Sequence, residues 1–487
     1  MFSNVSCISP TGAAPNTFVS AIQFFVTAQS LIQSKDWPPE AELQDSEVFD
    51  FIIVGAGTAG SILANRLSEI EDWSVLLLEA GGNPPIESEI PRLAMNLSGS
   101  KFDWQYTTVN NGLTSQANKD GRVKWPRGKM LGGSSSMNIM AHVQGIPRDY
   151  QSWYNEGNLE WHPDIIVKQY FKKAENLQDP ARLKIPDVNN HYGHNGPLTL
   201  NTFNSADAII AENLLSAFDE IGIKKVDDFN TANNLGSGRF ISTVSEGKRV
   251  SSATGYLNPI ARSRKNLKIV KDSFVTKVIF DGKTAIGVEV DHNGNKLTLK
   301  ARREVILSAG SINTPQLLML SGIGHEGDLA AKNIKTVIHS PMVGQNLHDH
   351  TMIPILIFAD EPEGIDEATK SFESLRYLYD RQGYLSSSDC DVTGFYSTDP
   401  NASYPDFQSV VFVNKKNDES IKSYASRFVE SVENSILEQS KNKSLIQVMQ
   451  ILLRPYSRGN ISLNSNDPYE DPLIYYDDFS DSRDLDL

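Results

Sequence analysis

A glycine-rich turn between a strand-like segment and a helical pattern constrains the fold of this chain more than any other feature. Residues 48–54 are Val-Phe-Asp-Phe-Ile-Ile-Val, a continuous apolar segment of strand length. The next six residues, 55–60, match the pattern GxGxxG, and a helical pattern continues over residues 61–70. A strand, a glycine turn and a helix in this order predict the first unit of a Rossmann-like α/β domain with a parallel sheet.

Each glycine of such a turn has its own steric task. Gly55 permits the tight turn, Gly57 lets backbone N–H groups approach a pyrophosphate, and Gly60 lets the helix pack close to the strand. Thr58 and Ala59 lie between the last two glycines and belong to the same predicted site. The N-terminus of the helix would then hold the phosphates of a dinucleotide.

The second strand-like segment, residues 74–78, ends in an acidic residue. Glu79 stands 19 positions after Gly60, where its carboxylate can accept hydrogen bonds from a ribose diol and would repel a phosphorylated ribose. A GxGxxG pattern alone also arises where glycines serve packing only. The strand, the helix and Glu79 together therefore carry the prediction of a dinucleotide site, and they do not separate FAD from NAD.

The remaining patterns predict how the chain is divided. Residues 305–307 are a third buried strand-like segment, whereas residues 268–281 and 287–299 alternate around the turns Asp281-Gly282 and Asn293-Gly294. This alternation predicts an accessory antiparallel meander. After residue 346, short alternating segments and a charged helical stretch over residues 415–444 predict a second, α+β domain.

A length of 487 residues exceeds one ordinary core, so two domains of unequal size are expected. Residues 1–46 are predicted to be a leader on the surface, with a short amphipathic helix over residues 18–32. The first domain is predicted at residues 47–345, the second at 346–453, and a C-terminal segment at 454–487.

Composition excludes several classes of function. The chain has 60 acidic and 45 basic residues, and the formal charge of -15 repels a nucleic acid backbone. The apolar stretch at residues 18–32 is too short and too mixed to span a membrane. Two cysteines, Cys7 and Cys390, leave at most one disulfide open and offer no zinc spacing. A small molecule is the expected partner.

Localisation stays open at this point. Five Asn-x-Ser/Thr sites would suit a secreted glycoprotein, at Asn4, Asn96, Asn401, Asn442 and Asn460. No signal-peptide pattern follows Met1. Either the protein is intracellular, or the sequence lacks its true start.

Two longer motifs identify the cofactor through a family resemblance. Residues 125–138, Trp-Pro-Arg-Gly-Lys-Met-Leu-Gly-Gly-Ser-Ser-Ser-Met-Asn, resemble the first signature of the glucose-methanol-choline (GMC) oxidoreductases, in which this loop wraps a flavin. Its glycines and hydroxyl residues also suit phosphate and a polar ring edge without the family. The resemblance assigns FAD contacts in this loop to Arg127, Met130, Leu131, Gly132, Ser134 and Asn138.

The second signature of the same family is matched throughout residues 310–324. It follows a predicted strand, so the resemblance places Ala309 and Gly310 against FAD, and the strand at 273–278 places the backbone of Val275 near the adenine. The resemblance covers residues 47–487 and includes insect glucose dehydrogenase-like members. It implies a substrate-binding domain built on an antiparallel sheet.

The histidines offer no catalyst by pattern alone. His142 stands where the family usually has an aromatic residue or alanine, and it is the one candidate for a substitute base. His348 and His350 flank Asp349 and suggest a metal site, but their segment matches a family that uses no metal there. His191 and His194 are expected in a solvated loop.

The resemblance implies a CH–OH oxidoreductase that passes hydride from a sugar or small alcohol to flavin and then to an electron acceptor, oxygen or a quinone. Such enzymes use a C-terminal histidine as general base, yet all nine histidines here lie at or before His350. We therefore expect a chain that stops within the family's C-terminal region, with no catalytic residue to assign. One alternative is a flavin-binding paralogue with a binding role. Another, implied by the resemblance, is lyase chemistry on the same fold with a structural flavin, as in the family's hydroxynitrile lyases, which also use C-terminal histidines.

Overall fold

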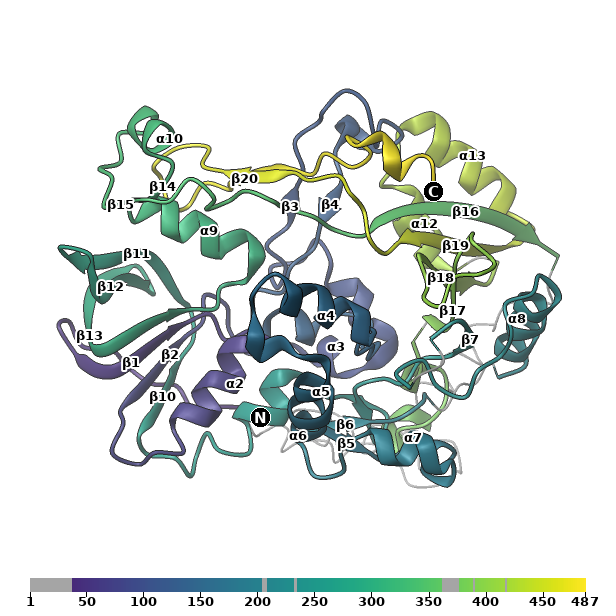
Figure 1. Ribbon diagram of the computed structural model, residues 1–487, viewed down its shortest axis with the longest axis horizontal. Helices are drawn as coiled ribbons and strands as arrows, with labels where there is room; N and C mark the ends of the chain where they lie inside the picture. Colours follow the sequence, from purple (N-terminus) through teal and green to yellow (C-terminus); the bar gives the residue numbers. More distant parts are fainter. Residues whose placement is uncertain (1–36, 204–207, 232–233, 361–375, 389, 417) are drawn as a thin grey trace, which may run out of the picture.

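The first sheet carries the glycine-rich turn at its centre. The computed structural model describes residues 37–203, 208–231, 234–360, 376–388, 390–416 and 418–487. The six strands lie in the order β10-β2-β1-β13-β12-β11, at the lower left of Figure 1. Their bounds are β1 Val48–Val54, β2 Val75–Leu78, β10 Leu267–Val270, β11 Ser273–Asp281, β12 Thr284–His292 and β13 Asn295–Leu307.

The central strands are buried because their side chains are apolar on both faces. All four residues of β2 are at most 1% exposed, and β10, β2, β1 and β13 pair in parallel. Helix α2 (Thr58–Leu67) follows β1, and α9 (Gly310–Leu320) follows β13. The predicted Rossmann-like domain is therefore confirmed.

The predicted meander is also confirmed, but it is not a separate sheet. β11, β12 and β13 pair antiparallel, and β13 is long enough to pair with β12 through its first half and with β1 through its second half. The two parts consequently form one continuous sheet.

The alternating segment over residues 268–281 does not belong to the meander throughout. Residues 267–270 form β10, which joins the parallel part of the sheet, and β11 begins only at Ser273. Between them Asp272 has a φ of 50°, and Lys271 is buried with its Nζ donating to the backbone oxygen of Pro38 and to Asn83 Oδ1. A tertiary contact thus breaks a segment whose local pattern is continuous.

The second sheet is antiparallel, with the strand order β16-β19-β18-β17-β7, and lies at the right of Figure 1. Its strands are β7 Gly236–Arg239, β16 Thr351–Ala359, β17 Cys390–Tyr396, β18 Phe407–Asn414 and β19 Ser444–Leu452. Helix α8 (Ala208–Glu220) packs on one face, while α12 (Glu419–Ala425) and α13 (Glu430–Ser440) cover the other. The antiparallel second sheet agrees with the fold expected from the resemblance.

The helical prediction over residues 415–444 is too long. The stretch holds two helices, α12 and α13, separated by residues 426–429, and β19 starts at Ser444. Strand β7 and helix α8 come from before residue 346, so the second sheet draws on both predicted domains. The boundaries at 346 and 454 remain predictions.

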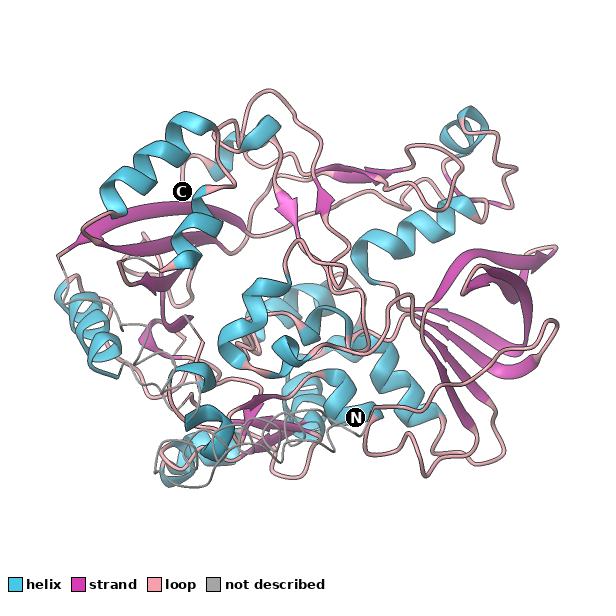
Figure 2. Cartoon of the chain, turned by 180° about the vertical axis from the view of Figure 1, so that it is seen from behind, coloured by secondary structure: helices cyan, strands magenta, loops and turns pink. Residues whose placement is uncertain are grey.

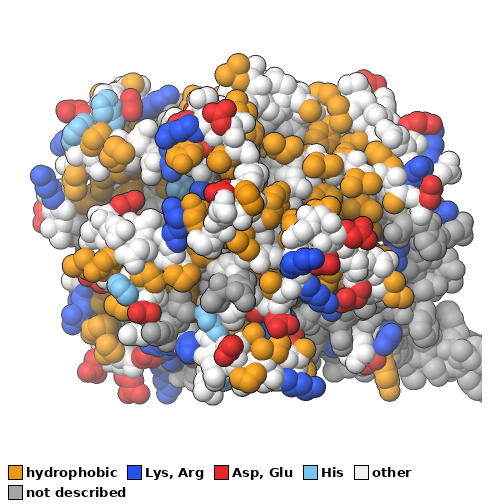
Figure 3. Space-filling model, turned by 45° about the vertical axis from the view of Figure 1, so that its right-hand side comes forward, with side chains coloured by type: hydrophobic (Ala, Val, Ile, Leu, Met, Phe, Trp, Pro, Cys, Tyr) orange, Lys and Arg blue, Asp and Glu red, His pale blue; other side chains and the backbone are white. Residues whose placement is uncertain are grey.

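The outer strand β16 is apolar and partly uncovered. Among its residues Met352, Ile353, Ile355 and Ile357 are 47–55% exposed. Figure 3, which brings this side of the molecule forward, shows hydrophobic side chains gathered in the upper part of the face.

Short elements lie between the two sheets and around their edges, as the view from behind in Figure 2 shows. The helices are α3 Ile86–Glu89, α4 Pro147–Asn155, α5 Pro163–Ile165, α6 Lys172–Ala174, α7 Pro186–His191 and α10 Glu326–Ala331. The short strands form pairs, namely β3 Tyr106–Thr107 with β4 Lys124–Trp125, β5 Glu175–Leu177 with β6 Leu198–Leu200, β8 Val244–Ser245 with β9 Lys248–Arg249, β14 Ile323–Gly324 with β15 Ile338–His339, and β20 Asn460–Ser462 with β21 Leu473–Tyr475.

Both ends of the described chain pack against the first domain. Of the predicted leader the structure describes residues 37–46, most of which lie at the surface, whereas Pro38 is buried and Trp37 packs against the core around β1 and β10. The helix predicted at residues 18–32 lies outside the described residues, as does Cys7. Ile461, Leu463 and Ile474 join the core beside α9. No helix within the described residues is long and apolar enough to cross a membrane.

Candidate active site

A cavity of about 480 Å³ lies at the carboxyl ends of β1, β2 and β13. This is where ligands bind in open α/β sheets, because the glycine turns and helix N-termini meet there. Ten of the fifteen residues predicted to contact the cofactor line it. They are Gly55, Gly57, Thr58, Ala59, Glu79, Arg127, Ser134, Val275, Ala309 and Gly310.

The three glycines of the turn differ in what surrounds them. A Cβ at Gly55 would lie 2.6 Å from the backbone oxygen of Ser308, and a Cβ at Gly60 would lie 1.9 Å from the backbone oxygen of Gly55. A Cβ at Gly57 would meet nothing nearer than the Cα of Gly133, at 4.0 Å. Gly55 and Gly60 therefore serve packing, and the space beside Gly57 is left for a ligand.

Glu79 is fastened to the glycine turn. Its Oε2 accepts a 2.9 Å hydrogen bond from the backbone N–H of Ala56, and its Oε1 accepts one of 2.9 Å from Gly81. The side chain is buried, and this burial raises the pKa of Glu79 to about 7. Each carboxylate oxygen keeps a further lone pair for a hydroxyl group in the cavity.

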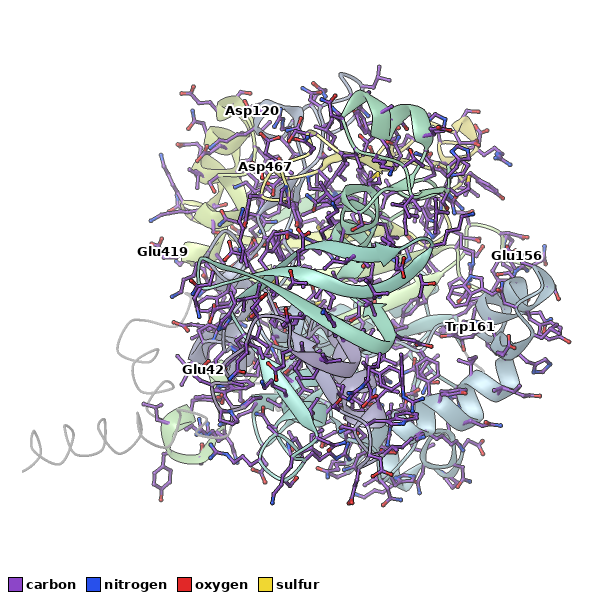
Figure 4. The ribbon with its side chains drawn as sticks, turned by 90° about the vertical axis from the view of Figure 1, so that its left-hand side faces the viewer. Glu42, Asp120, Glu156, Trp161, Glu419 and Asp467 are labelled. Carbon is purple, nitrogen blue, oxygen red and sulfur yellow. The ribbon has the colours of Figure 1, made fainter. Side chains whose placement is uncertain are left out.

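Aromatic side chains cover the other end of the cavity. Trp104 and Phe274 both line it, with ring centroids 6.0 Å apart. Phe274 stacks on Tyr469, whose hydroxyl donates a 2.6 Å hydrogen bond to Asp291. In Figure 4 the labelled Asp467, two residues before Tyr469, lies above the strands of the first sheet. The C-terminal segment thus helps to enclose the cavity beside β11.

The loop predicted to wrap the flavin divides into residues that line the cavity and residues that hold the loop in place. Met130 and Leu131 are fully buried in the core, and Gly132 donates its N–H to the backbone oxygen of Ala56. These three do not line the cavity. Gly133 does, and its Cα faces Gly57, so two glycine segments approach each other at the same point.

Asn138 also lies outside this cavity and is held by Arg249, which sequence reasoning missed. Nη1 and Nη2 of Arg249 donate 2.7 Å hydrogen bonds to Oδ1 and to the backbone oxygen of Asn138. Arg249 is 4% exposed, and burial lowers its pKa to about 9. It also donates to the backbone oxygens of Ser88 and Ser135. A lone arginine gives no sequence signal for such a role.

Residues 49–352 match the family described as GMC oxidoreductase. The chain belongs to the GMC oxidoreductase family. It is 40% identical over 483 residues to ecdysone oxidase from Bombyx mori, an alignment covering 99% of this chain and 71% of that protein. It is 33% identical over 487 residues to glucose dehydrogenase (FAD, quinone) from Drosophila pseudoobscura pseudoobscura, covering 97% of this chain and 74% of that protein.

Solved structures of GMC proteins share this fold. A formate oxidase variant from Aspergillus oryzae RIB40, studied for FAD modification, superposes with a TM-score of 0.78 at 29% identity, covering 91% of this chain and 79% of that chain. Pyridoxine 4-oxidase superposes with a TM-score of 0.73 at 26% identity, covering 90% and 78%. The chain is accordingly an enzyme of the GMC class with FAD as its cofactor.

The geometry of the cavity fits this cofactor. Gly57 and Gly133 leave an open cradle at the N-terminus of α2, where partial positive charge favours a pyrophosphate. Glu79 lies beside this cradle, and Trp104 and Phe274 offer flat faces to a nucleobase. A Cβ at Gly57 would occupy the cradle itself.

The histidine singled out as a substitute base is held in a polar network. His142 Nε2 lies 2.9 Å from Oε1 of Glu175, a residue with no exposed surface. Gln144 donates to the same oxygen and accepts from His191, whose pKa is lowered by burial. His191 is therefore half-buried at the end of α7, which corrects its expected place in a solvated loop. His194 is exposed, as predicted.

The histidines of residues 348–350 lie where the chain enters the second sheet. Burial lowers the pKa of both His348 and His350. No group of three or more His, Cys, Asp or Glu side chains within the described ranges is arranged to hold a metal ion.

Proposed function

We propose that the chain binds FAD in the cavity at the carboxyl ends of β1, β2 and β13 and oxidises a CH–OH group of a sugar or small alcohol. The observation that carries this proposal is the open cradle at Gly57, on which two signature loops and the end of β2 converge. FAD, when bound, supplies the hydride acceptor.

The residues of the chain would bind and orient this cofactor. The backbone at Gly57 and Gly133 and the N-terminus of α2 would hold the pyrophosphate. Glu79 would accept a hydrogen bond from the adenosine ribose, and the backbone of Val275 would contact the adenine. The electron acceptor in this proposal is oxygen or a quinone.

We further propose that the chain as written turns over slowly, because no histidine follows His350 to serve as the family's general base. The bond from His142 to Glu175 argues against His142 as a substitute. The second candidate function is that of a flavin-binding paralogue with a binding role, and the same network at His142 favours it.

The test is anaerobic incubation of the FAD-loaded chain with a panel of alcohols and sugars. The panel includes ecdysone and glucose, because relatives named for each of them align over nearly the whole chain. Slow bleaching of the flavin absorbance by one compound supports the oxidoreductase. FAD binding without reduction by any compound supports the paralogue. A folded chain that takes up no flavin would contradict both candidate functions.

A further inference from the structure

A second cavity of about 400 Å³ lies between the two sheets, apart from the proposed cofactor site. One wall is formed by α4 and the loop before it, residues 143–146, which continues the flavin signature. The other wall comes from β17, β18 and the residues after β19. The cavity therefore joins the signature loop to the second sheet.

Two charged side chains at this cavity satisfy each other. Asp149 accepts a 3.0 Å hydrogen bond from Arg454 Nη2 and another of 3.0 Å from the backbone N–H of Ile146. Arg454 also donates to the backbone oxygen of Pro405. Because the two charges are paired with each other, the cavity offers no unpaired charge of this pair to a charged ligand.

The amide side chains at the cavity are also used within the protein. Gln144 donates to Glu175 at 2.6 Å and accepts from His191 at 2.8 Å. Gln408 donates to the hydroxyl of Thr393 at 3.1 Å. A sugar would need several polar partners, and the bonds to Glu175, His191 and Thr393 already use part of the hydrogen-bonding capacity of these side chains.

One acceptor in the wall is different. Asn234 lines the cavity, and its Oδ1 is buried without a hydrogen-bond partner among the described residues. A buried acceptor without a partner is unfavourable, so a ligand hydroxyl that donates to it would be stabilised.

The rest of the wall is mainly apolar and aromatic; it also includes Tyr150, whose hydroxyl donates to the backbone oxygen of Gln144, and His350, whose pKa is lowered by burial. The rings of Phe229 and Phe395 lie 5.0 Å apart, and Leu453 adjoins them in the lining. Trp153 lines the cavity and is 44% exposed. Its ring lies 4.9 Å from that of Trp161, which is 42% exposed but does not line the cavity. Figure 4 shows Trp161 at the outer edge of the molecule.

We propose that this cavity binds the ring-bearing, apolar body of an alcohol whose hydroxyl group donates to Asn234. The inference rests on the proposed function and narrows its substrate class from sugars and small alcohols to lipophilic alcohols. A polyhydroxylated sugar fits poorly, because most of its hydroxyl groups would face aromatic carbon without a partner.

Calorimetric titration of the FAD-loaded chain with 2-naphthylmethanol tests the proposal, with glucose as the comparison ligand. Trp153→Ala and Asn234→Ala should each weaken binding about tenfold, as expected for one lost aromatic contact or hydrogen bond. Trp161→Ala is the matched control and should leave the affinity unchanged. Glucose should neither bind nor compete. If Trp153→Ala does not fold, Val143→Asp places a carboxylate at the half-exposed rim and should abolish binding instead.

Equal weakening by the two tryptophan variants would overturn the proposal, as would glucose binding that depends on Asn234, or no binding of 2-naphthylmethanol at all. Flavin absorbance is recorded on the same samples. A failure of the proposed oxidoreductase activity can therefore be distinguished from a failure of alcohol binding in the second cavity. Flavin reduction that is unaffected by Trp153→Ala and Asn234→Ala would contradict the role of this cavity in alcohol binding and leave the oxidoreductase function supported. Loss of FAD with retained binding of 2-naphthylmethanol would contradict the proposed oxidoreductase function and leave the alcohol-binding cavity supported.

Discussion

The backbone N–H of Ala56 donates a 2.9 Å hydrogen bond to Oε2 of Glu79, which ties the glycine turn after β1 to the end of β2. The same carboxylate borders the cavity. One side chain therefore holds the turn in place and presents an acceptor to the cavity. The turn and the acid are separate motifs in the sequence, but they are one unit in the structure.

Gly57→Ala should fold normally and lose FAD. Gly57 has a φ of -70° and a ψ of -164°, which alanine adopts freely, and the added Cβ points into open space. Thermal unfolding of the flavin-free variant should match the parent chain, while reconstitution should give no flavin absorbance. The matched control is Gly60→Ala, which should unfold at a lower temperature because its Cβ meets backbone at 1.9 Å. Normal FAD uptake by Gly57→Ala would show that the pyrophosphate lies elsewhere.

Glu79→Ala should weaken FAD about 5- to 150-fold. This range corresponds to about 1 to 3 kcal/mol for one buried hydrogen bond to the ribose. Because the substitution also removes the acceptor for Ala56 and Gly81, Glu79→Gln is measured beside it as the conservative variant. Fluorescence titration with FAD gives both affinities. Unchanged affinity in both variants would make Glu79 a structural residue only.

The stability of the flavin-free chain should fall as pH rises through the pKa of Glu79. Burial raises this pKa from 4.5 to about 7, so the folded state favours the protonated acid. The stabilisation of the folded state by protonated Glu79 is fully present below pH 4.5 and is lost as pH rises through 7. The free energy of unfolding should drop by up to about 3 kcal/mol from this group.

Urea unfolding at several pH values measures this drop, and the slope should be absent in Glu79→Gln. Saturation with FAD should reduce it in the parent chain, since a ribose hydroxyl that donates to the carboxylate favours its ionised form. Parallel pH profiles for the parent and Glu79→Gln would contradict the assignment.

Arg249→Lys should destabilise the chain and loosen the loop at Asn138. Four acceptor oxygens surround the buried guanidinium, and lysine has three donors on a single atom that cannot reach the same positions. The free energy of unfolding should fall by at least about 1.5 to 3 kcal/mol. Arg302→Lys is the control. Arg302 is exposed, so this substitution should lower the free energy of unfolding by less than about 1 kcal/mol. Equal losses of unfolding free energy in the two variants would contradict the proposal that Arg249 holds the loop at Asn138 in place.

Local pattern was sufficient where an element is defined by its own side chains. Strand β1 was predicted over residues 48–54, and the turns at Asp281-Gly282 and Asn293-Gly294 separate β11, β12 and β13 as expected. Pattern failed at Lys271, where contacts with Pro38 and Asn83 end one strand before the next begins. It also failed between α12 and α13, where the charged composition is continuous but the helix is not.

The candidate site divides in the same way. Ten predicted residues line the first cavity because glycine signatures act through local backbone geometry. Arg249 escaped prediction because its hydrogen bonds join it to residues far away in the sequence, and Asn234 because its proposed role depends on an Oδ1 atom that has no hydrogen-bond partner among the described residues. The His142 to Glu175 contact is of this kind as well, since it joins residues 33 positions apart.

The chain as written should reduce its flavin slowly with every alcohol and sugar tested. An alcohol releases hydride readily only as its hydroxyl proton leaves, and general-base assistance typically contributes about 10² to 10⁴ in rate. His142 is the one histidine close in sequence to the flavin loop, and its Nε2 already faces Glu175 at 2.9 Å. The ring is therefore oriented toward Glu175, while the backbone N–H of His142 donates to the backbone oxygen of Ile241.

Stopped-flow reduction under anaerobic conditions tests this, with His142→Ala and His194→Ala compared in parallel. His142→Ala should lower the free energy of unfolding by about 1 to 3 kcal/mol, because Glu175 loses a buried partner, and should leave the slow reduction rate unchanged. His194→Ala should change neither quantity, since that side chain is exposed. Reduction within seconds by any compound would refute the expectation of slow turnover. If that fast reduction were lost in His142→Ala and kept in His194→Ala, His142 would be the base, and the contact with Glu175 would orient its ring for proton transfer.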